Sequence, residues 1–215
     1  PKTPAAVCQS EGCTLMRLPS RAMKILAFSS PYPGRARRRR YTSPASSTRR
    51  WADALEGTAA TVRDTRKTTP GLRALEKYAV RCGGGSNHRM GLSDMALVKD
   101  NHVAAAGGVT EAFRRVREVA ASIPVEIEVD TLDGLREAIA AGADEVLIDN
   151  FTPDEMREAV AVRDGMNRAV RLEASGGLTL DSARAVAETG VDYIAVGELT
   201  HSARILDIGL DLRTV

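Results

Sequence analysis

A short apolar run followed by an amphipathic stretch recurs six times along this 215-residue chain, and this repeat constrains the fold more than any other feature. Strands buried in a parallel sheet read as short, nearly continuous apolar runs, whereas helices repeat apolar residues every three or four positions. The predicted strands are residues 60–64, 96–100, 125–130, 145–149, 170–175 and 193–197. Strands and helices that alternate with short connections predict a parallel α/β barrel or a doubly wound sheet.

Local start and stop signals delimit the helices between these strands. Threonine is a preferred N-terminal cap, and proline is tolerated in the first helical turn. The predicted helix starts are Thr110, Thr131, Thr152 followed by Pro153, and Thr179. Glycine readily adopts the left-handed conformation at a helix end, so Gly142 and Gly190 are predicted to close two of these helices.

The first 46 residues differ in composition from the rest of the chain. Six of the nine prolines lie before residue 50, together with an arginine-rich run at residues 35–40 and serines within residues 43–47. This segment shows neither helical nor strand periodicity. We expect residues 1–46 to be a disordered arm or an out-of-frame segment, and residues 47–215 to form an α/β barrel catalytic domain.

Charge is distributed unevenly between these two parts. The first fifty residues hold eleven Lys and Arg and one acid, a net charge of +10, so the remainder carries −8 against a total of +2. Nucleic-acid binding normally requires a basic globular surface, and here the basic residues belong to the short N-terminal segment. The charge pattern therefore does not favour a nucleic-acid partner.

The cysteines and the hydropathy pattern bear on location. Cys8, Cys13 and Cys82 show no metal-ligand spacing with the histidines and no disulfide framework. No apolar run approaches the roughly 20 residues that a membrane helix needs. We therefore expect a cytoplasmic protein without a membrane partner.

Polar or small residues end all six predicted strands, and the carboxyl ends of barrel strands are where such folds place their chemistry. These positions hold Asp64, Arg66 and Lys67; Lys99 and Asp100; Glu128 and Asp130; Asp149 and Asn150; Glu173 and Ser175; and Gly197 and Glu198. One such charge usually means a solvated surface group. Six strand ends in register favour a binding site.

Two kinds of charge gather at these ends. The cations are Arg66, Lys67, Arg89 and Lys99. They suit a ligand that carries carboxylates or phosphates. Glu128 and Asp149 end neighbouring predicted strands and offer the oxygen ligands that Mg2+ takes beside pyrophosphate. Each set alone is also compatible with internal salt bridges, whereas the two together indicate an anionic substrate and a metal.

A Ser-Gly-Gly turn at residues 175–177 follows the fifth predicted strand, and Gly197 follows the sixth. Small residues allow backbone N–H groups to approach a phosphate at the start of a helix. Such a turn alone often means only a tight bend, but phosphate sites of barrels tend to use the final two loops. These positions therefore predict phosphate binding.

Residues 64–102 read DTRKTTPGLRALEKYAVRCGGGSNHRMGLSDMALVKDNH, and this stretch is similar to the signature region of the quinolinate phosphoribosyltransferase family. The later segments EIEVD, LIDNF, LEASGGL and GVDYIAVGELTHSA also resemble that family, in the same order. The resemblance covers residues 48–212 and none of the first 46. It implies a truncated, six-stranded parallel α/β barrel, joined in the family to an N-terminal α/β sandwich domain that we expect to be missing or scrambled here.

The resemblance also implies an activity. The family transfers phosphoribose from phosphoribosyl pyrophosphate to quinolinate with Mg2+, a pentosyl transfer of NAD biosynthesis that gives nicotinate mononucleotide, pyrophosphate and CO2. By resemblance, the residues that hold the quinolinate carboxylates are Thr65, Arg66, Lys67, Arg89 and Lys99, with His88 beside them. The implied phosphate-binding residues are Ser175, Gly176, Gly177, Val196, Gly197 and Glu198. Glu128 and Asp149 would serve the ribose and the metal, Lys99 would complete the catalytic set, and the enzyme would be a homodimer.

Two departures from the family pattern keep alternatives open. An arginine of the family's N-terminal domain contacts quinolinate in the partner subunit's site, and residues 1–46 contain no recognisable counterpart. Glu198 stands where a small residue is expected, and His201 is as compatible with helix capping as with phosphate contact. The alternatives are a catalytically impaired fragment and a paralogous barrel that acts on another phosphorylated metabolite. The complete TRK and NHR motifs argue against the paralogue.

Overall fold

The computed structural model describes residues 15–17, 24–26, 44–203 and 209–210, and the chain divides into two compact units. Unit 1 comprises Pro1–Thr42 and Arg204–Val215, and its described part is an antiparallel sheet of three short strands in the order β1-β2-β9. These strands are β1 (Leu15–Arg17), β2 (Lys24–Leu26) and β9 (Gly209–Leu210). Unit 2, Ser43–Ala203, holds the predicted strands and helices.

Helix α1 (Pro44–Ala54) begins three residues before the expected domain boundary at residue 47. Residues 44–46, which composition places in the arm, thus belong to a helix in which Thr48 and Trp51 are buried. Burial of this helix face outweighs the weak helix propensity of its serines. Strands β1 and β2 lie within the range expected to be a disordered or out-of-frame arm, and apart from these strands and residues 44–46 that range falls outside the described residues.

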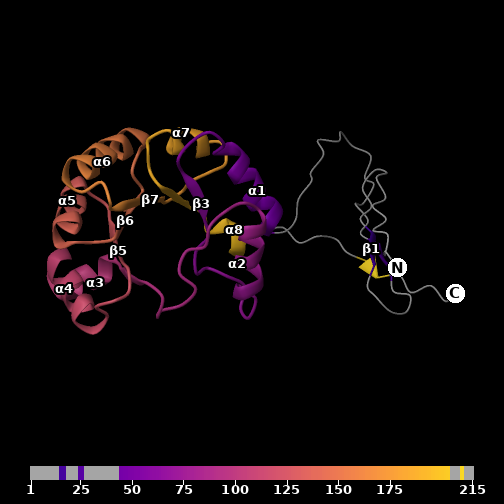
Figure 1. Ribbon diagram of the computed structural model, residues 1–215, viewed down its shortest axis with the longest axis horizontal. Helices are drawn as coiled ribbons and strands as arrows, with labels where there is room; N and C mark the ends of the chain where they lie inside the picture. Colours follow the sequence, from indigo (N-terminus) through magenta and orange to yellow (C-terminus); the bar gives the residue numbers. More distant parts are fainter. Residues whose placement is uncertain (1–14, 18–23, 27–43, 204–208, 211–215) are drawn as a thin grey trace, which may run out of the picture. The chain divides into compact units, whose positions relative to one another are not determined.

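Unit 2 contains a six-stranded, entirely parallel sheet in the order β3-β8-β7-β6-β5-β4. Its strands are β3 (Thr61–Arg63), β4 (Ala96–Val98), β5 (Val125–Val129), β6 (Glu145–Asp149), β7 (Arg171–Ser175) and β8 (Tyr193–Ala195). All six predicted strands are therefore confirmed. Edge strands β3 and β4 do not pair with each other in the described structure, so the curled sheet stays open as a truncated barrel (Figure 1).

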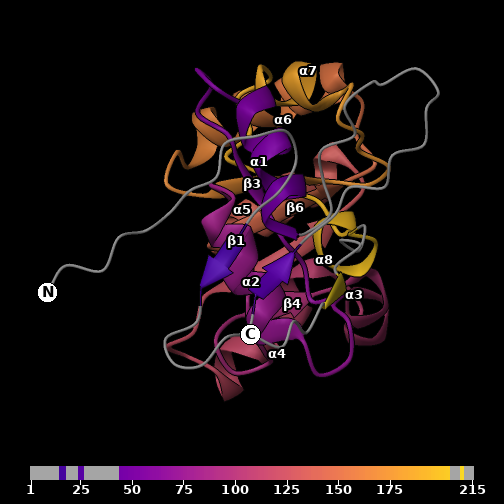
Figure 2. The same cartoon turned by 90° about the vertical axis from the view of Figure 1, so that its right-hand side faces the viewer.

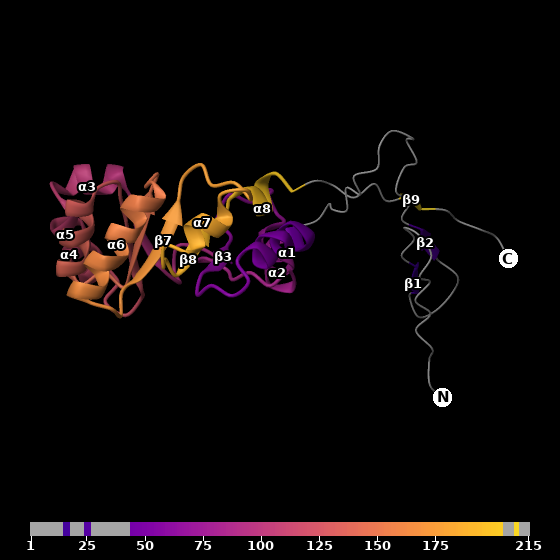
Figure 3. The same ribbon diagram turned by 90° about the horizontal axis from the view of Figure 1, so that it is seen from above.

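Helices cover the outside of this sheet. Besides α1, the helices of unit 2 are α2 (Arg73–Cys82), α3 (Asp100–Ala106), α4 (Val109–Val119), α5 (Leu132–Ala141), α6 (Pro153–Met166), α7 (Ala183–Ala187) and α8 (Glu198–His201). Figure 1 shows α4 to α7, α1 and α2 on an arc around the strands. Helices α1, α2 and α8 lie side by side (Figure 3), and α7 lies beside α6 and α1 (Figure 2). Among the described residues, no helix combines the length and apolar character needed to cross a membrane.

Two of the four predicted helix starts are confirmed. Thr131 caps α5 by accepting a hydrogen bond from the Gly134 N–H, and Thr152 forms a reciprocal capping box with Glu155 at the start of α6. Gly142 closes α5 in the left-handed conformation, as predicted. The Thr131 and Thr152 signals work because each cap involves only side-chain and backbone groups of its own helix turn.

The other two starts are wrong. Gly108 precedes α4, so Thr110 is its second residue, and Ser182 rather than Thr179 precedes α7. Thr110 instead bonds Glu137 of the neighbouring helix, with both distances 2.9 Å. Gly190 is left-handed, at φ +97°, but it follows the end of α7 at Ala187 by three residues.

Alternation along the strands gives the barrel two different faces. In β5, Val125, Ile127 and Val129 belong to the apolar core, whereas Glu126 and Glu128 point to the opposite, interior face. The interior of a small barrel is usually filled with branched apolar side chains. In this barrel the interior contains charged side chains, which lie next to the site at the mouth.

Candidate active site

A pocket of about 410 Å3 lies at the carboxyl ends of the strands, and most of the predicted site residues line it. They are Thr65, Arg66, Lys67, His88, Arg89, Lys99, Glu128, Asp149 and Ser175. Residues from six different strand ends and loops thus meet around one cavity, as parallel strands require. The cations that follow the early strands and the acids that end the middle strands therefore share one pocket, as their positions at the strand ends predict.

The remaining predicted residues lie beside the pocket rather than in its wall. These are Gly176, Gly177, Val196, Gly197 and Glu198. Val196 is buried, and Glu198 accepts a hydrogen bond from the Trp51 indole at 3.3 Å. The carboxylate that departs from the family pattern is therefore held by helix α1.

Three cations of the pocket form no ion pair with any acid that the structure describes. In the described part of the chain, Arg66, Lys67 and Arg89 form no salt bridge, and Arg66 Nε is buried without a hydrogen-bond partner. Burial lowers the pKa of Arg89, and the neighbouring positive charge of Arg66 lowers it further. Two adjacent guanidinium groups that form no salt bridge favour the binding of an anion.

The loop that carries the first two of these cations is fixed by short local contacts. Lys67 N–H donates to Thr65 Oγ1 at 3.1 Å, which forms a tight turn directly after β3. Thr200 of α8 donates its hydroxyl to Lys67 O at 2.7 Å. The segments that follow β8 and β3 are therefore linked at the mouth. These strands are the last and the first of the parallel sheet in the sequence.

Lys99 differs from the other cations because it already has a partner. Its Nζ forms an ion pair with Glu128 Oε2, and their side chains are 48% and 17% exposed. The Lys99 N–H also donates to His102 Nδ1 at 2.9 Å. Asp149 receives a hydrogen bond at 2.7 Å from the side chain of Asn150. Glu128 and Asp149 therefore both line the pocket, and each has a carboxylate oxygen bonded to a polar side chain.

The loops after β6 and β7 interlock through two unusual backbone conformations. Asn150 has φ +59°, and its N–H donates to Ser175 O at 3.0 Å. Gly176 has φ +94°, and a Cβ placed there would lie 2.2 Å from Asn150 Oδ1 and 2.7 Å from Asn150 N. Only glycine fits this position, whereas Gly177, at φ +57°, has no atom within 4 Å of a built Cβ.

Beneath the pocket, the barrel interior holds a buried charged layer. Arg63 Nη1 pairs with Glu145 at 2.6 Å and with Glu173 at 2.8 Å, and its guanidinium stacks 3.7 Å from the Tyr193 ring centroid. Burial raises the pKa of Glu173 to about 7 and that of Glu126 to about 8. Acids with such values can hold a proton at neutral pH, so this layer does not carry its full formal charge.

A second buried pair fixes the segment that contains His88. Lys77 Nζ and Asp64 form an ion pair with both side chains buried. Asp64 also accepts from the His88 N–H at 2.9 Å, and Lys77 donates to His88 O at 2.9 Å. Sequence reasoning counted Asp64 among the polar strand ends at the mouth. Asp64 instead faces Lys77, because a carboxylate with no exposure needs a cation and hydrogen-bond donors around it.

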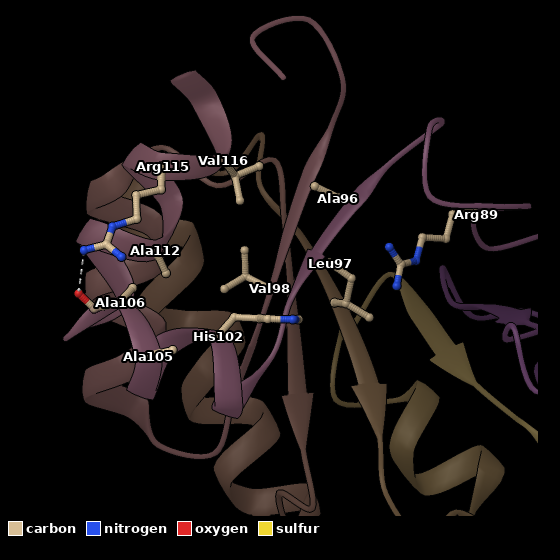
Figure 4. A pocket seen from close by; sticks show the side chains of 10 residues that line it. All are labelled: Arg89, Ala96, Leu97, Val98, His102, Ala105, Ala106, Ala112, Arg115 and Val116. Carbon is tan, nitrogen blue, oxygen red and sulfur yellow. Dashed lines mark hydrogen bonds between the residues drawn. The ribbon is translucent and has the colours of Figure 1, made fainter. Parts of the chain in front are cut away.

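A second, mostly apolar hollow of about 360 Å3 adjoins the site at edge strand β4 and helices α3 and α4. Figure 4 shows the Arg89 side chain reaching toward Leu97, while Val98, Ala112 and Val116 lie on the other side of β4. Arg89 and Leu97 line both cavities. The Arg89 side chain thus borders both the active-site pocket and this apolar hollow.

A family model described as quinolinate phosphoribosyl transferase, C-terminal domain, matches residues 45–211. The chain belongs to this family. Carboxylating nicotinate-nucleotide pyrophosphorylase of Mycobacterium leprae is 59% identical over 162 residues, which cover 75% of this chain and 57% of that protein. The human protein of the same name is 45% identical over 152 residues, 70% of this chain and 51% of that protein. This chain therefore spans somewhat more than half the length of these curated relatives.

Solved structures agree with this assignment. Nicotinate-nucleotide pyrophosphorylase from Francisella tularensis matches with a TM-score of 0.75 at 42% identity, and the match covers 80% of this chain and 60% of that one. The protein of that name from Pyrococcus furiosus, at 20% identity and a TM-score of 0.62, shows the same fold. The truncated barrel of the quinolinate phosphoribosyltransferase family is thus confirmed for this chain.

Sequence reasoning missed the residues of the buried layer. Arg63 and Glu126 were placed only within apolar strands and Glu173 among the mouth residues, and Lys77 was given no role. One signal was available, since Glu126 stands two positions before Glu128 and therefore on the same face of β5. Nothing in the sequence indicated that Lys77 would pair with a strand end.

Proposed function

We propose that this chain carries the phosphoribosyl-transfer site of a carboxylating nicotinate-nucleotide pyrophosphorylase, which joins quinolinate to phosphoribosyl pyrophosphate. One observation carries the proposal. Among the described residues, Arg66, Lys67 and Arg89 form no salt bridge, and they share one pocket with Lys99 and a pair of carboxylates. Family membership and the names of the similar proteins support it.

The cations would bind the two adjacent carboxylates of quinolinate. Guanidinium groups match a carboxylate with two parallel hydrogen bonds, and Arg66 lies close enough to Arg89 for its positive charge to lower the pKa of Arg89. A dianion between them would remove that repulsion. Lys99 would contribute a third positive group once a ligand draws it away from Glu128, and Thr65 would contribute a hydroxyl.

Glu128 and Asp149 would hold Mg2+ beside the pyrophosphate group. The donor chemistry fits, because Mg2+ prefers oxygen and is commonly held by one or two carboxylates that share it with substrate phosphates. Both acids line the same pocket from neighbouring strands β5 and β6. When bound, the ion would neutralise the negative charge that grows on the departing pyrophosphate.

The residues of the chain would supply positioning and electrostatics rather than a nucleophile. The quinolinate nitrogen attacks the anomeric carbon as the bond to pyrophosphate breaks, and positive charge develops on the ribose. Carboxylates of Glu128 and Asp149 would stabilise that charge. Loss of CO2 from the carbon next to the ring nitrogen then leaves an electron pair on that carbon, where the cationic nitrogen stabilises it until a proton binds.

The final two loops would bind phosphate through backbone groups. Gly177 has open space around it, and Gly197 lies next to the Lys67 side chain, since a Cβ there would be 3.5 Å from Lys67 Cδ. Ser175 contributes its side chain to the pocket wall. The hydrogen bond from Trp51 to Glu198 supports this role, because it holds on helix α1 a carboxylate that would otherwise repel a phosphate.

Assembly and location are further parts of the proposal. The family resemblance suggests a homodimer, and light scattering coupled to gel filtration would measure its mass. A cytoplasmic location rests on the absence of a disulfide framework among the three cysteines. Quinolinate and phosphoribosyl pyrophosphate would be the partners, with neither nucleic acid nor membrane required.

Calorimetric titration tests the proposed function. Wild-type chain is expected to bind quinolinate more tightly than nicotinate, which lacks one of the two carboxylates. Lys99→Ala should abolish this preference with little loss of stability, because an ion pair with a half-exposed lysine contributes about 0–1 kcal/mol. CO2 release from quinolinate with phosphoribosyl pyrophosphate and Mg2+ measures turnover.

Arg136→Ala is the matched control, since Arg136 forms an exposed ion pair with Asp133 on α5. It should bind quinolinate as the wild type does. Equal affinity of the wild type for quinolinate and nicotinate would overturn the proposal. A large drop in melting temperature for Lys99→Ala would instead identify Lys99 as structural.

A further inference from the structure

We infer that His88 is a positioning residue, whose ring tethers the backbone of Arg89 and is itself fixed by Glu126, so that its nitrogens do not bind the substrate. This inference rests on the proposed function for its consequence, which is the placement of an arginine that binds a substrate carboxylate. Sequence resemblance places His88 next to the quinolinate carboxylates. The structure assigns both ring nitrogens to protein groups instead.

The hydrogen bonds of His88 determine its tautomer. Arg89 N–H lies 2.8 Å from His88 Nδ1, and a backbone N–H can only donate, so Nδ1 must accept and carries no proton. A neutral ring then bears its proton on Nε2, which lies 2.6 Å from Glu126 Oε2 and donates to it. An imidazolium would place two N–H groups against each other at Nδ1. Burial, which lowers the pKa of His88, also favours the neutral ring.

Little of the ring remains available to a ligand. His88 is 8% exposed, and both nitrogens are committed to Arg89 and Glu126. The ring therefore presents carbon atoms to the pocket that it lines. A carboxylate of the substrate would have to break one of two short hydrogen bonds to reach a ring nitrogen.

His88 is rigid enough to act as a tether because its own backbone is held at both ends. Its N–H is bound by Asp64, and its carbonyl is bound by Lys77. Arg89 needs such a tether, since the adjacent positive charge of Arg66 would otherwise push it out of the pocket. Beyond the tether, only a 3.2 Å bond from Arg89 Nη1 to Met95 O holds its side chain in the described structure.

Glu126 is the residue that sets the ring. It is fully buried, its Oε1 has no hydrogen-bond partner, and its Oε2 binds His88. His88, Glu126 and Glu173 also place three possible metal-ligand atoms within 4.8 Å of one another. However, Arg63 binds Glu173 in the same layer at 2.8 Å, and its positive charge opposes a second cation there.

Nitrogen-detected NMR of the histidine rings tests the inference directly, and the chain has only three histidines. In the wild type at neutral pH, His88 should carry its proton on Nε2, with Nδ1 unprotonated. Added quinolinate should move the Arg89 amide resonance and leave this tautomer unchanged. A protonated Nδ1, an imidazolium at neutral pH, or a ring nitrogen that gains a bond to quinolinate would overturn the inference.

Two substitutions of Glu126 separate tethering from mere structure. Glu126→Gln keeps a carbonyl that accepts from Nε2–H, so it should retain the tautomer and quinolinate affinity. Glu126→Leu should release the ring, shift the Arg89 amide resonance and weaken quinolinate binding about tenfold or more. The matched control is Arg163→Met, which breaks a buried 2.8 Å ion pair with Asp192 outside the pocket wall. It should lower stability without changing affinity or tautomer.

The outcomes distinguish this inference from the proposed function. If the wild type binds no quinolinate, the proposed function fails, while the tautomer and the Arg89 amide shift of Glu126→Leu still decide the tether. If Glu126→Leu binds quinolinate as the wild type does and leaves Arg89 unshifted, the tether is refuted. A His88 resonance that moves on addition of Zn2+ alone would assign the buried group to a metal and also refute it.

Discussion

Replacing Gly176 with alanine tests how the loops after β6 and β7 are joined. At φ +94° a side chain costs about 1–2 kcal/mol in backbone energy. The new Cβ would also lie 2.2 Å from Asn150 Oδ1 and 2.7 Å from Asn150 N, which no real contact allows. Relieving this overlap moves Asn150 and strains its bond to Ser175 O, at a further cost of about 1–3 kcal/mol. We expect a total loss of about 2–5 kcal/mol.

Gly177→Ala is the control, because the chemical change is identical and φ is also positive. No atom lies within 4 Å of its built Cβ, so only the backbone term of about 1–2 kcal/mol applies. Urea unfolding followed by circular dichroism measures the stability of both variants. A loss of about 1–3 kcal/mol in unfolding free energy lowers the urea midpoint by about 1 M. Equal losses for the two variants would refute the packing argument, since the overlap with Asn150 would then contribute nothing.

Two further predictions concern the buried charges. Lys77→Met should lower the free energy of unfolding by about 3–5 kcal/mol, because it leaves the Asp64 carboxylate buried without its cation. Arg184→Ala, at an exposed pair, should cost less than about 1 kcal/mol when both variants are compared by urea unfolding, and similar losses would contradict the argument. Folding raises the pKa of Glu126 from 4.5 to about 8, so the folded state holds a proton that the unfolded chain releases, and stability should fall as pH rises across that window. Glu126→Gln should flatten this fall in denaturant titrations at several pH values, whereas an unchanged slope would assign it to Glu173 or other groups.

Local sequence signals predicted the helix starts only where the cap involves its own turn. Thr131 and Thr152 bond N–H groups three residues ahead, and both predictions are confirmed. Thr110 offers the same local signal but bonds Glu137 of another helix, while Gly108 at φ +147° takes the cap position. The neighbouring helix supplied an alternative partner that spacing along the chain does not reveal.

The candidate site could be predicted well at its rim and poorly beneath it. Parallel strands place their carboxyl ends at one mouth, so Arg66, Lys99, Glu128 and Asp149 were expected to meet, and they line one pocket. The predicted role of His88 depended on resemblance alone. Its ring environment comes from a strand 38 residues away, which no local pattern specifies.

The sequence by itself determined the six strands, their order of polar ends and the family, because apolar periodicity and the motif at residues 64–102 are properties of contiguous residues. Only the tertiary structure decided which charges face the ligand and which neutralise one another inside. Arg63 finds its partner Glu173 110 residues away, across a strand order that places β8 between β3 and β7. Coulomb energy depends on distance in space and on burial, and both are set by how the strands pack.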